Sequence, residues 1–172
     1  MTGLLPAVAA AVAAHGLDVE VLPCDPELAD TAEFCEHYGF ALDDAANTIV
    51  VTSKKVEPPV RAVCVVLGTT RLDVNKVCRE RLGAKRVSFA DAETTVELTG
   101  MEIGGVTAPG IEGLPLWIDA AVLGRERVVM GGGNRSSKLA LDPRELLKLP
   151  GAEVVEGLAN PLMSSPNPEG TG

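Results

Sequence analysis

Residues 48–67 read TIVVTSKKVEPPVRAVCVVL and indicate two strands joined by a turn. The runs at 48–52 and 61–67 are rich in β-branched residues, which favour extended backbone on a packed surface. Between them, Lys54, Lys55 and a Pro-Pro pair are typical of a loop. We therefore predict a β-hairpin.

Short strand patterns alternate with helical patterns on both sides of this hairpin. Further strands are expected at 19–22, 86–89, 116–119, 127–130, 138–141 and 152–155. Helices are expected at 4–14, 31–38, 73–82 and 91–99 and after Asp142-Pro143. Because hairpin-like pairs occur together with connections through helices, the sequence predicts an α/β domain with a mixed sheet.

The length of 172 residues fits one domain with a substantial core. We place this domain at residues 1–159. From Asn160 onward, Pro, Ser, Gly and Asn dominate, so we expect residues 160–172 to form a disordered tail.

Charge and hydropathy exclude several classes of protein. The net charge of −9 argues against a protein that coats DNA or RNA without sequence preference, and we expect no DNA partner. The alanine-rich run at 4–14 has no basic residue before it and carries Pro6 near its start, so we interpret it as a helix and not as a signal sequence. No run is long and apolar enough to span a bilayer. We expect a cytoplasmic protein with no membrane partner.

The four cysteines do not predict a metal site or a disulfide framework. They are widely separated and include no CxxC pair. Cys64 lies inside an apolar strand, which favours a reduced core residue. We expect no metal ion and no cofactor.

Two glycine-rich stretches are candidates for ligand binding. The first, residues 104–110, reads GGVTAPG, and its glycines would let a carbonyl oxygen approach the backbone N–H groups. The second, residues 131–138, reads GGGNRSSK and combines glycines with Arg135 and Lys138, a plausible contact for an anion or an RNA backbone. For either stretch, an ordinary turn or a flexible hairpin is the alternative.

The acidic chain has one local excess of basic residues. Six arginines and lysines lie between Arg71 and Arg86. A solvated helix face explains them, and so does a docking surface for nucleic acid.

Taken in order, these motifs resemble the YbaK/ProX family, the free-standing relatives of the editing domain inserted in bacterial prolyl-tRNA synthetases. The resemblance covers residues 4–158. It depends on residues 46–51 (ANTIVV), Leu72-Asp73 opening a helix that ends in 82–85 (LGAK), 90–93 (ADAE), Thr99-Gly100, the GxxxP element at 105–109 (GVTAP), 117–119 (WID) and 132–135 (GGNR).

The resemblance implies a fold and an activity. The family fold is a mixed, partly barrel-like β-sheet surrounded by helices. Family members hydrolyse the ester between an amino acid and the 3′ end of the wrong tRNA without a metal ion. Mischarged aminoacyl-tRNA is then the expected partner, with an aminoacyl-tRNA synthetase as a further candidate partner.

By this resemblance, Gly105 and Asn47 are candidate catalytic residues, and Lys138 is a third candidate although relatives commonly carry an uncharged or acidic residue there. The candidate substrate-binding residues are Thr107, Pro109, Asp119, Gly132, Asn134, Arg135 and Ser136. In relatives a lysine usually occupies the position of Asn47, and the asparagine keeps hydrogen-bonding capacity but lacks the cation. We hypothesise that Lys138 supplies the cation from another wall of the pocket. Trans-editing deacylation is the predicted function, and non-catalytic binding of aminoacyl-tRNA or of an amino acid derivative is the alternative.

Overall fold

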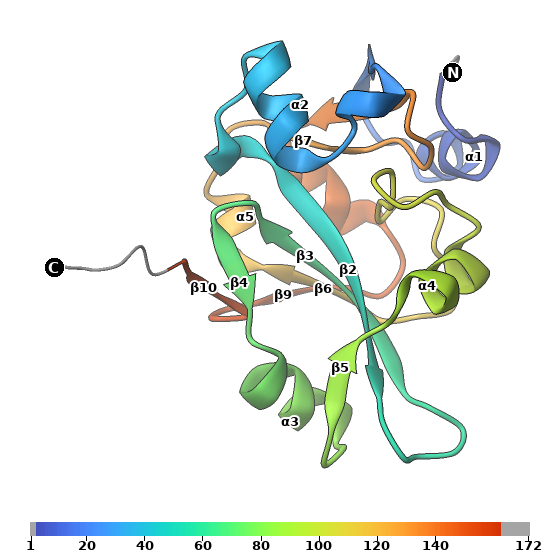
Figure 1. Ribbon diagram of the computed structural model, residues 1–172, viewed down its shortest axis with the longest axis vertical. Helices are drawn as coiled ribbons and strands as arrows, with labels where there is room; N and C mark the ends of the chain where they lie inside the picture. Colours follow the sequence, from blue (N-terminus) through green and yellow to red (C-terminus); the bar gives the residue numbers. More distant parts are fainter. Residues whose placement is uncertain (1–2, 163–172) are drawn as a thin grey trace, which may run out of the picture.

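The computed structural model describes residues 3–162, and the predicted hairpin forms the middle of its largest sheet (Figure 1). Strand β2 (Ala46–Ser53) pairs antiparallel with β3 (Arg61–Leu67), from Ala46 opposite Leu67 to Thr52 opposite Arg61. The hairpin predicted from the sequence is confirmed.

This sheet has five strands in the order β5-β2-β3-β6-β9. Strand β5 (Val87–Phe89) is antiparallel to β2, whereas β6 (Leu116–Asp119) is parallel to β3 and β9 (Ala152–Val155) is parallel to β6. The predicted mixed sheet is confirmed.

A second, antiparallel sheet has three strands in the order β1-β8-β7. These strands are β1 (Val19–Pro23), β7 (Val128–Gly131) and β8 (Ser137–Leu141). A third sheet pairs β4 (Thr70–Leu72) with β10 (Ala159–Pro161). None of these sheets closes into a barrel, so the barrel-like character that the resemblance implied is not seen as a closed sheet among residues 3–162.

The helices lie around these sheets (Figure 1). The α-helices are α1 (Pro6–Ala14), α2 (Thr31–Tyr38), α3 (Arg79–Leu82), α4 (Ala92–Thr99) and α5 (Ala120–Leu123). Short 3-10 turns cover Pro26–Leu28, Leu42–Asp44 and Pro143–Lys148, and a π-helical turn at Val74–Cys78 leads into α3. No described helix is both long and apolar enough to cross a bilayer.

Local sequence signals explain where these helices begin and end. Helix α2 ends at Gly39, whose φ of 81° is a left-handed conformation that glycine adopts without strain. Helix α4 begins after Asp91, whose carboxylate accepts a hydrogen bond of 2.7 Å from the Thr94 N–H. Asp142 accepts the Arg144 N–H in the same way, but a 3-10 helix follows it where an α-helix was expected.

Strand β3 is buried on both faces because it lies between the two larger apolar clusters. Val63 and Val65 pack into the cluster that contains α1 and β8. Cys64 and Val66 point to the opposite face and pack with Trp117 in the second cluster. The near-continuous apolar run of this strand reflects its two buried faces.

The sequence analysis missed β4, α5 and β10, and β10 corrects the domain boundary. Asn160 pairs with Arg71 and Pro161 with Thr70, so folded structure continues beyond residue 159. These elements have only three or four residues, too few for a periodic pattern to predict them. Residues 163–172 of the expected tail lie outside the described residues.

Candidate functional site

A cavity of about 330 Å³ lies between α2, β2, the β7–β8 hairpin and the loop that follows α4. Its volume is at the lower end of the range for small-molecule sites. Polar groups at the cavity come from Thr31, Asn47, Thr48, Thr95 and Lys138. Apolar groups come from Phe34, Cys35, Ala45, Ala46, Ile49, Val50, Ala90, Ile103, Val106, Val129 and Met130, and Gly104 and Gly131 complete the lining.

Among the described residues, Lys138 is the only basic residue at this cavity. Its side chain is almost fully buried, with the residue 6% exposed. It lies in the middle of the three-stranded sheet, opposite Gly131 on β7 and Leu22 on β1. The ammonium donates to the carbonyl oxygens of Ala29 at 2.6 Å and Gly104 at 3.2 Å. Since a lysine ammonium has three N–H donors, one remains for a group bound in the cavity.

Burial lowers the pKa of Lys138, because the charged ammonium loses hydration. The nearby Arg135 lowers this pKa further, whereas Asp30 and the thiols of Cys24 and Cys35 oppose the change. The ring of Phe34, 5.3 Å from Nζ, adds a favourable cation–π contact. The two carbonyls and the ring therefore partly replace the water that the ammonium loses.

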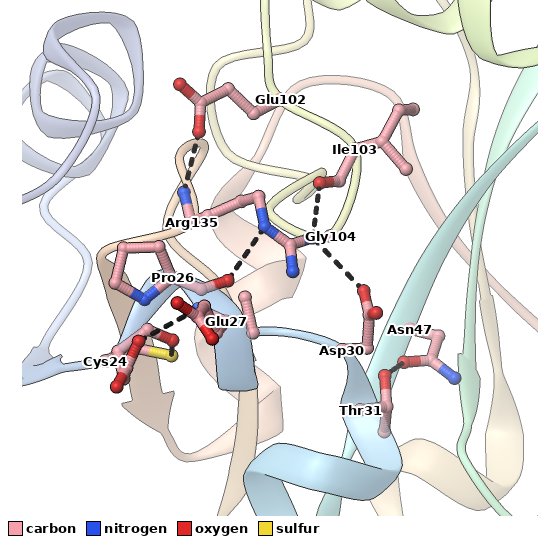
Figure 2. A network of polar contacts seen from close by, with 12 residues as sticks. Cys24, Pro26, Glu27, Asp30, Thr31, Asn47, Glu102, Ile103, Gly104 and Arg135 are labelled. Atoms are coloured by element: carbon pink, nitrogen blue, oxygen red, sulfur yellow. Dashed lines mark hydrogen bonds and ion pairs between the residues drawn. The ribbon is translucent and has the colours of Figure 1, made fainter.

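Asn47 lines the same cavity from strand β2. Its Oδ1 accepts a hydrogen bond of 2.7 Å from the hydroxyl of Thr31 at the start of α2 (Figure 2). This bond orients the amide so that its NH₂ group is the end left for a ligand. The adjacent Thr48 contributes a buried hydroxyl that has no hydrogen-bond partner among the described residues.

The two glycine-rich stretches pack directly against each other. The Gly133 N–H donates to the Gly105 carbonyl at 2.7 Å. A Cβ added at Gly105 would lie 2.6 Å from the carbonyl carbon of Asn134, and one added at Gly131 would lie 2.7 Å from that of Gly105. Gly105 therefore serves the close approach of two backbones. It does not line the cavity, where Gly104 and Val106 represent this stretch.

Arg135 does not line the cavity. Figure 2 shows its polar contacts with the segments beside the cavity. Its guanidinium donates to the carbonyls of Pro26 and Ile103, each at 2.9 Å, and pairs with Asp30 at 3.2 Å. Its backbone N–H donates to Glu102. The arginine thus links the start of α2 to the loop that presents Gly104.

Thr107 and Pro109, predicted to bind substrate, are buried outside the cavity lining. The Thr107 N–H contacts the sulfur of Met101 at 3.4 Å. The buried Thr107 hydroxyl has no hydrogen-bond partner among the described residues.

Gly132, Asn134 and Ser136, predicted for the same role, also lie outside the lining. Gly132 accepts the Leu5 N–H, and the Asn134 amide donates to the Gly3 carbonyl. The Ser136 N–H donates back to Asn134. These residues hold the second stretch against the N-terminal segment.

Asp119 is 2% exposed at the end of β6 and does not line the cavity. Burial raises its pKa, and the backbone N–H groups of Ala159 and Leu158 oppose that rise. Its Oδ2 has no hydrogen-bond partner among the described residues.

The structure adds cavity residues that the sequence analysis did not assign a catalytic or substrate-binding role. Thr31 and Phe34 are three residues apart on a predicted helix, so they share one face. Ile103 and Gly104 flank the predicted GxxxP element on its N-terminal side. The helical spacing could have shown that Thr31 and Phe34 share a face. No local sequence pattern indicated that this face meets β2 and Lys138. Within residues 3–162 no three His, Cys, Asp or Glu side chains converge as metal ligands.

The sequence profile of the aminoacyl-tRNA editing domain matches residues 25–149, which include every residue of the cavity lining. The chain belongs to this family. The resemblance inferred from the sequence motifs is confirmed, and the cavity lies within the matched editing domain.

Solved structures have the same fold as this editing domain. The hypothetical protein APE2540 is 28% identical with a TM-score of 0.79, covering 90% of this chain and 99% of its own. A proposed trans-editing enzyme for prolyl-tRNA synthetase is 27% identical with a TM-score of 0.74, covering 89% and 97%. A protein assigned to signal transduction from Marinobacter aquaeolei VT8 is 15% identical with a TM-score of 0.63, covering 91% and 31%, and shows a likeness of fold alone.

Proposed function

We propose that this editing domain hydrolyses the ester between an amino acid and the 3′ end of a mischarged tRNA, and that the Lys138 cavity holds the aminoacyl group. Membership of the editing family supports the reaction class. The similarity to a proposed trans-editing enzyme for prolyl-tRNA synthetase supports action on a free aminoacyl-tRNA, with tRNA(Pro) as the first candidate.

The observation that carries this proposal is the ammonium of Lys138, buried at the cavity with one N–H left for a ligand. Attack of water on the ester carbonyl places negative charge on the carbonyl oxygen. A fixed cation in a poorly hydrated site stabilises that charge strongly. The water oxygen bonds to the carbonyl carbon, and the bond from that carbon to the ribose oxygen breaks. One proton of the water goes to the ribose oxygen, and the other leaves to solvent as the amino acid carboxylate forms. The proposed step needs no metal ion.

Asn47 has a supporting role in this scheme. Its NH₂ group, directed by the Thr31 hydroxyl, is a second donor for the ester or for the attacking water. A lysine at this position would place two ammonium groups at one cavity of about 330 Å³. One cation and one neutral amide avoid that repulsion.

The cavity walls favour a small, apolar amino acid side chain. Phe34, Val106 and Met130 are part of a largely apolar lining. A pocket of this kind discriminates by only about 1–3 kcal/mol per methylene, so we expect neighbouring small amino acids to be accepted as well.

Binding without hydrolysis is the second candidate function. Asn47 at the position where relatives usually carry lysine favours it. This alternative requires that the Lys138 cavity holds an aminoacyl group but does not accelerate attack on it.

A deacylation screen separates the two candidates. Purified protein is mixed with tRNAs, tRNA(Pro) among them, charged with alanine, serine, cysteine or proline, and the loss of each ester is followed over time. Deacylation of one small mischarged amino acid well above the rate without protein supports the proposal. Tight binding with no acceleration supports the binding function.

A further inference from the structure

The basic residues of this acidic protein are concentrated in one segment. Residues 54–86 contain nine basic and three acidic residues, a net charge of +6. The rest of the chain contains six basic and 21 acidic residues, a net charge of −15. The charge is therefore strongly asymmetric along the sequence.

Ion pairing sharpens this asymmetry. After residue 120, every basic residue except the buried Lys138 pairs with a carboxylate: Arg125 with Asp44, Arg127 with Glu20, Arg135 with Asp30, Arg144 with Asp142 and Lys148 with Glu145. Within 54–86 only Arg81 has such a partner among the described residues. Seven exposed basic residues have no carboxylate partner within residues 3–162: Lys54, Lys55, Arg71, Lys76, Arg79, Lys85 and Arg86. We call them the basic surface.

The fold gathers the basic surface from separate elements. The Lys54 N–H donates to the Arg86 carbonyl at 2.9 Å, which joins the tip of the β2–β3 hairpin to the start of β5. Strand β5 also packs against the turn that carries Lys76 and leads into α3. In Figure 1 the hairpin tip, β5 and α3 lie together at the end of the molecule away from α2.

Strand β5 connects this surface to the cavity. Ala90, directly after β5, lines the cavity, and its N–H donates to Val50. From Ala90 back to Arg86 the chain covers four residues, roughly 13 Å of extended backbone. Phe89 lies between them and is 53% exposed, so its ring is available for stacking on a base.

We propose that the basic surface binds the phosphates of the tRNA acceptor stem while the 3′ end of the same tRNA enters the cavity. This inference depends on the proposed function and names the surface that would hold the rest of the substrate. Lysines and arginines without carboxylate partners neutralise phosphates without first breaking an ion pair. The distance from the surface to the cavity suits an unpaired 3′ end that leaves a base-paired stem.

The test compares two double variants with the same net charge of −11. Lys85→Ala/Arg86→Ala removes two cations of the basic surface, and Arg127→Ala/Arg144→Ala removes two ion-paired cations elsewhere. Binding of uncharged tRNA(Pro) is measured from 50 to 200 mM KCl. We expect the first variant to bind about tenfold more weakly and its salt slope to fall by about 2, and the control to stay within twofold of the parent.

Several outcomes overturn the proposal. They are equal losses in both variants, no loss in either, and binding of the parent to phosphatidylserine vesicles but not to tRNA. Thermal unfolding of both variants checks that each is folded.

Hydrolysis assays keep this inference distinct from the proposed function. On an aminoacyl-tRNA, the first variant should lose at least tenfold more kcat/KM than it loses on a 3′-aminoacyl-adenosine, which has no stem. If tRNA binds through the basic surface but no ester is hydrolysed, the proposed function fails and the surface stands. If the ester is hydrolysed and both variants match the parent, the surface is wrong and the function stands.

Discussion

Lys138 and Asp119 are both buried ionisable residues that the sequence motifs assigned to the site, but the structure puts them in different surroundings. Lys138 lines the cavity, and its ammonium has backbone carbonyls on two sides. Asp119 lies at the end of β6, away from the cavity, beside the N–H groups of Leu158 and Ala159.

The difference shows that burial and a shifted pKa do not by themselves indicate chemistry. Desolvation raises the pKa of Asp119 and lowers that of Lys138, so each shift favours the neutral form of the group. Only Lys138 combines that burial with access to a space in which a ligand fits. We therefore expect loss of Lys138 to affect catalysis and loss of Asp119 to affect folding.

Lys138→Met should have the largest effect on activity, about 10²- to 10³-fold lower hydrolysis, because the charge on the carbonyl oxygen would lose its donor. Stability should change by less than about 1 kcal/mol, since an apolar chain of similar length replaces a buried charge. Single-turnover deacylation and urea unfolding measure the two effects. Lys148→Met, at an exposed lysine, is the control, and a parental rate in Lys138→Met would refute the catalytic role.

Asn47→Lys should have the second largest effect. It tests whether Lys138 replaces the cation that relatives carry at position 47. If Lys138 is the working cation, a second ammonium should lower deacylation at least tenfold. Like charges about 4 Å apart cost about 4 kcal/mol at an effective dielectric near 20. Faster hydrolysis in this variant would instead identify the parent as a degenerate deacylase, and the same assay on Asn47→Gln controls for the change of length.

Asp119→Ala should reduce the free energy of unfolding by about 1–3 kcal/mol, because buried N–H groups would lose their acceptor. Deacylation per folded molecule should remain within twofold of the parent. Urea unfolding and an assay normalised to folded protein give the comparison. A tenfold loss of activity with parental stability would instead return Asp119 to the substrate-binding site.

The two residues should also give stability opposite dependences on pH. The raised pKa of Asp119 means that its favourable contribution is present below 3.8 and is lost as pH rises through the folded-state value. The lowered pKa of Lys138 means that the cost of its burial is present at low pH and disappears as pH rises toward 10.5. As pH rises, the free energy of unfolding of the parent minus that of Asp119→Asn should therefore fall. The same difference between the parent and Lys138→Met should rise. If both differences changed with pH in the same direction, the surroundings described for Asp119 and Lys138 would be wrong.

Thr31→Val should have the smallest effect. It removes the hydroxyl that orients the Asn47 amide but keeps the shape of the side chain. One neutral hydrogen bond contributes about 1 kcal/mol, so we expect roughly fivefold slower hydrolysis with little change in stability. Thr31→Ser should restore most of the rate, and a rate equal to the parent in Thr31→Val would show that the amide needs no orientation.

The glycine-rich stretches show what a composition signal establishes and what it leaves open. Their composition correctly indicated that the backbone needs close approach, and the structure places the backbone at Asn134 against Gly105. A catalytic role of Gly105 stays a prediction. A glycine signals missing side-chain volume and cannot tell what occupies the space.

The sequence by itself determined the hairpin, the mixed sheet, most helix boundaries and the family, because β-branched runs, caps and glycine stops act over a few residues. It also placed Asn47 and Lys138 on the list of candidates. Only the tertiary structure decided that these two residues share a cavity with Thr31 and Gly104, while Asp119 and Arg135 lie outside its lining. That distinction depends on contacts between segments more than 80 residues apart, such as Lys138 with the Phe34 ring and the Ala29 carbonyl, and no local pattern encodes such contacts.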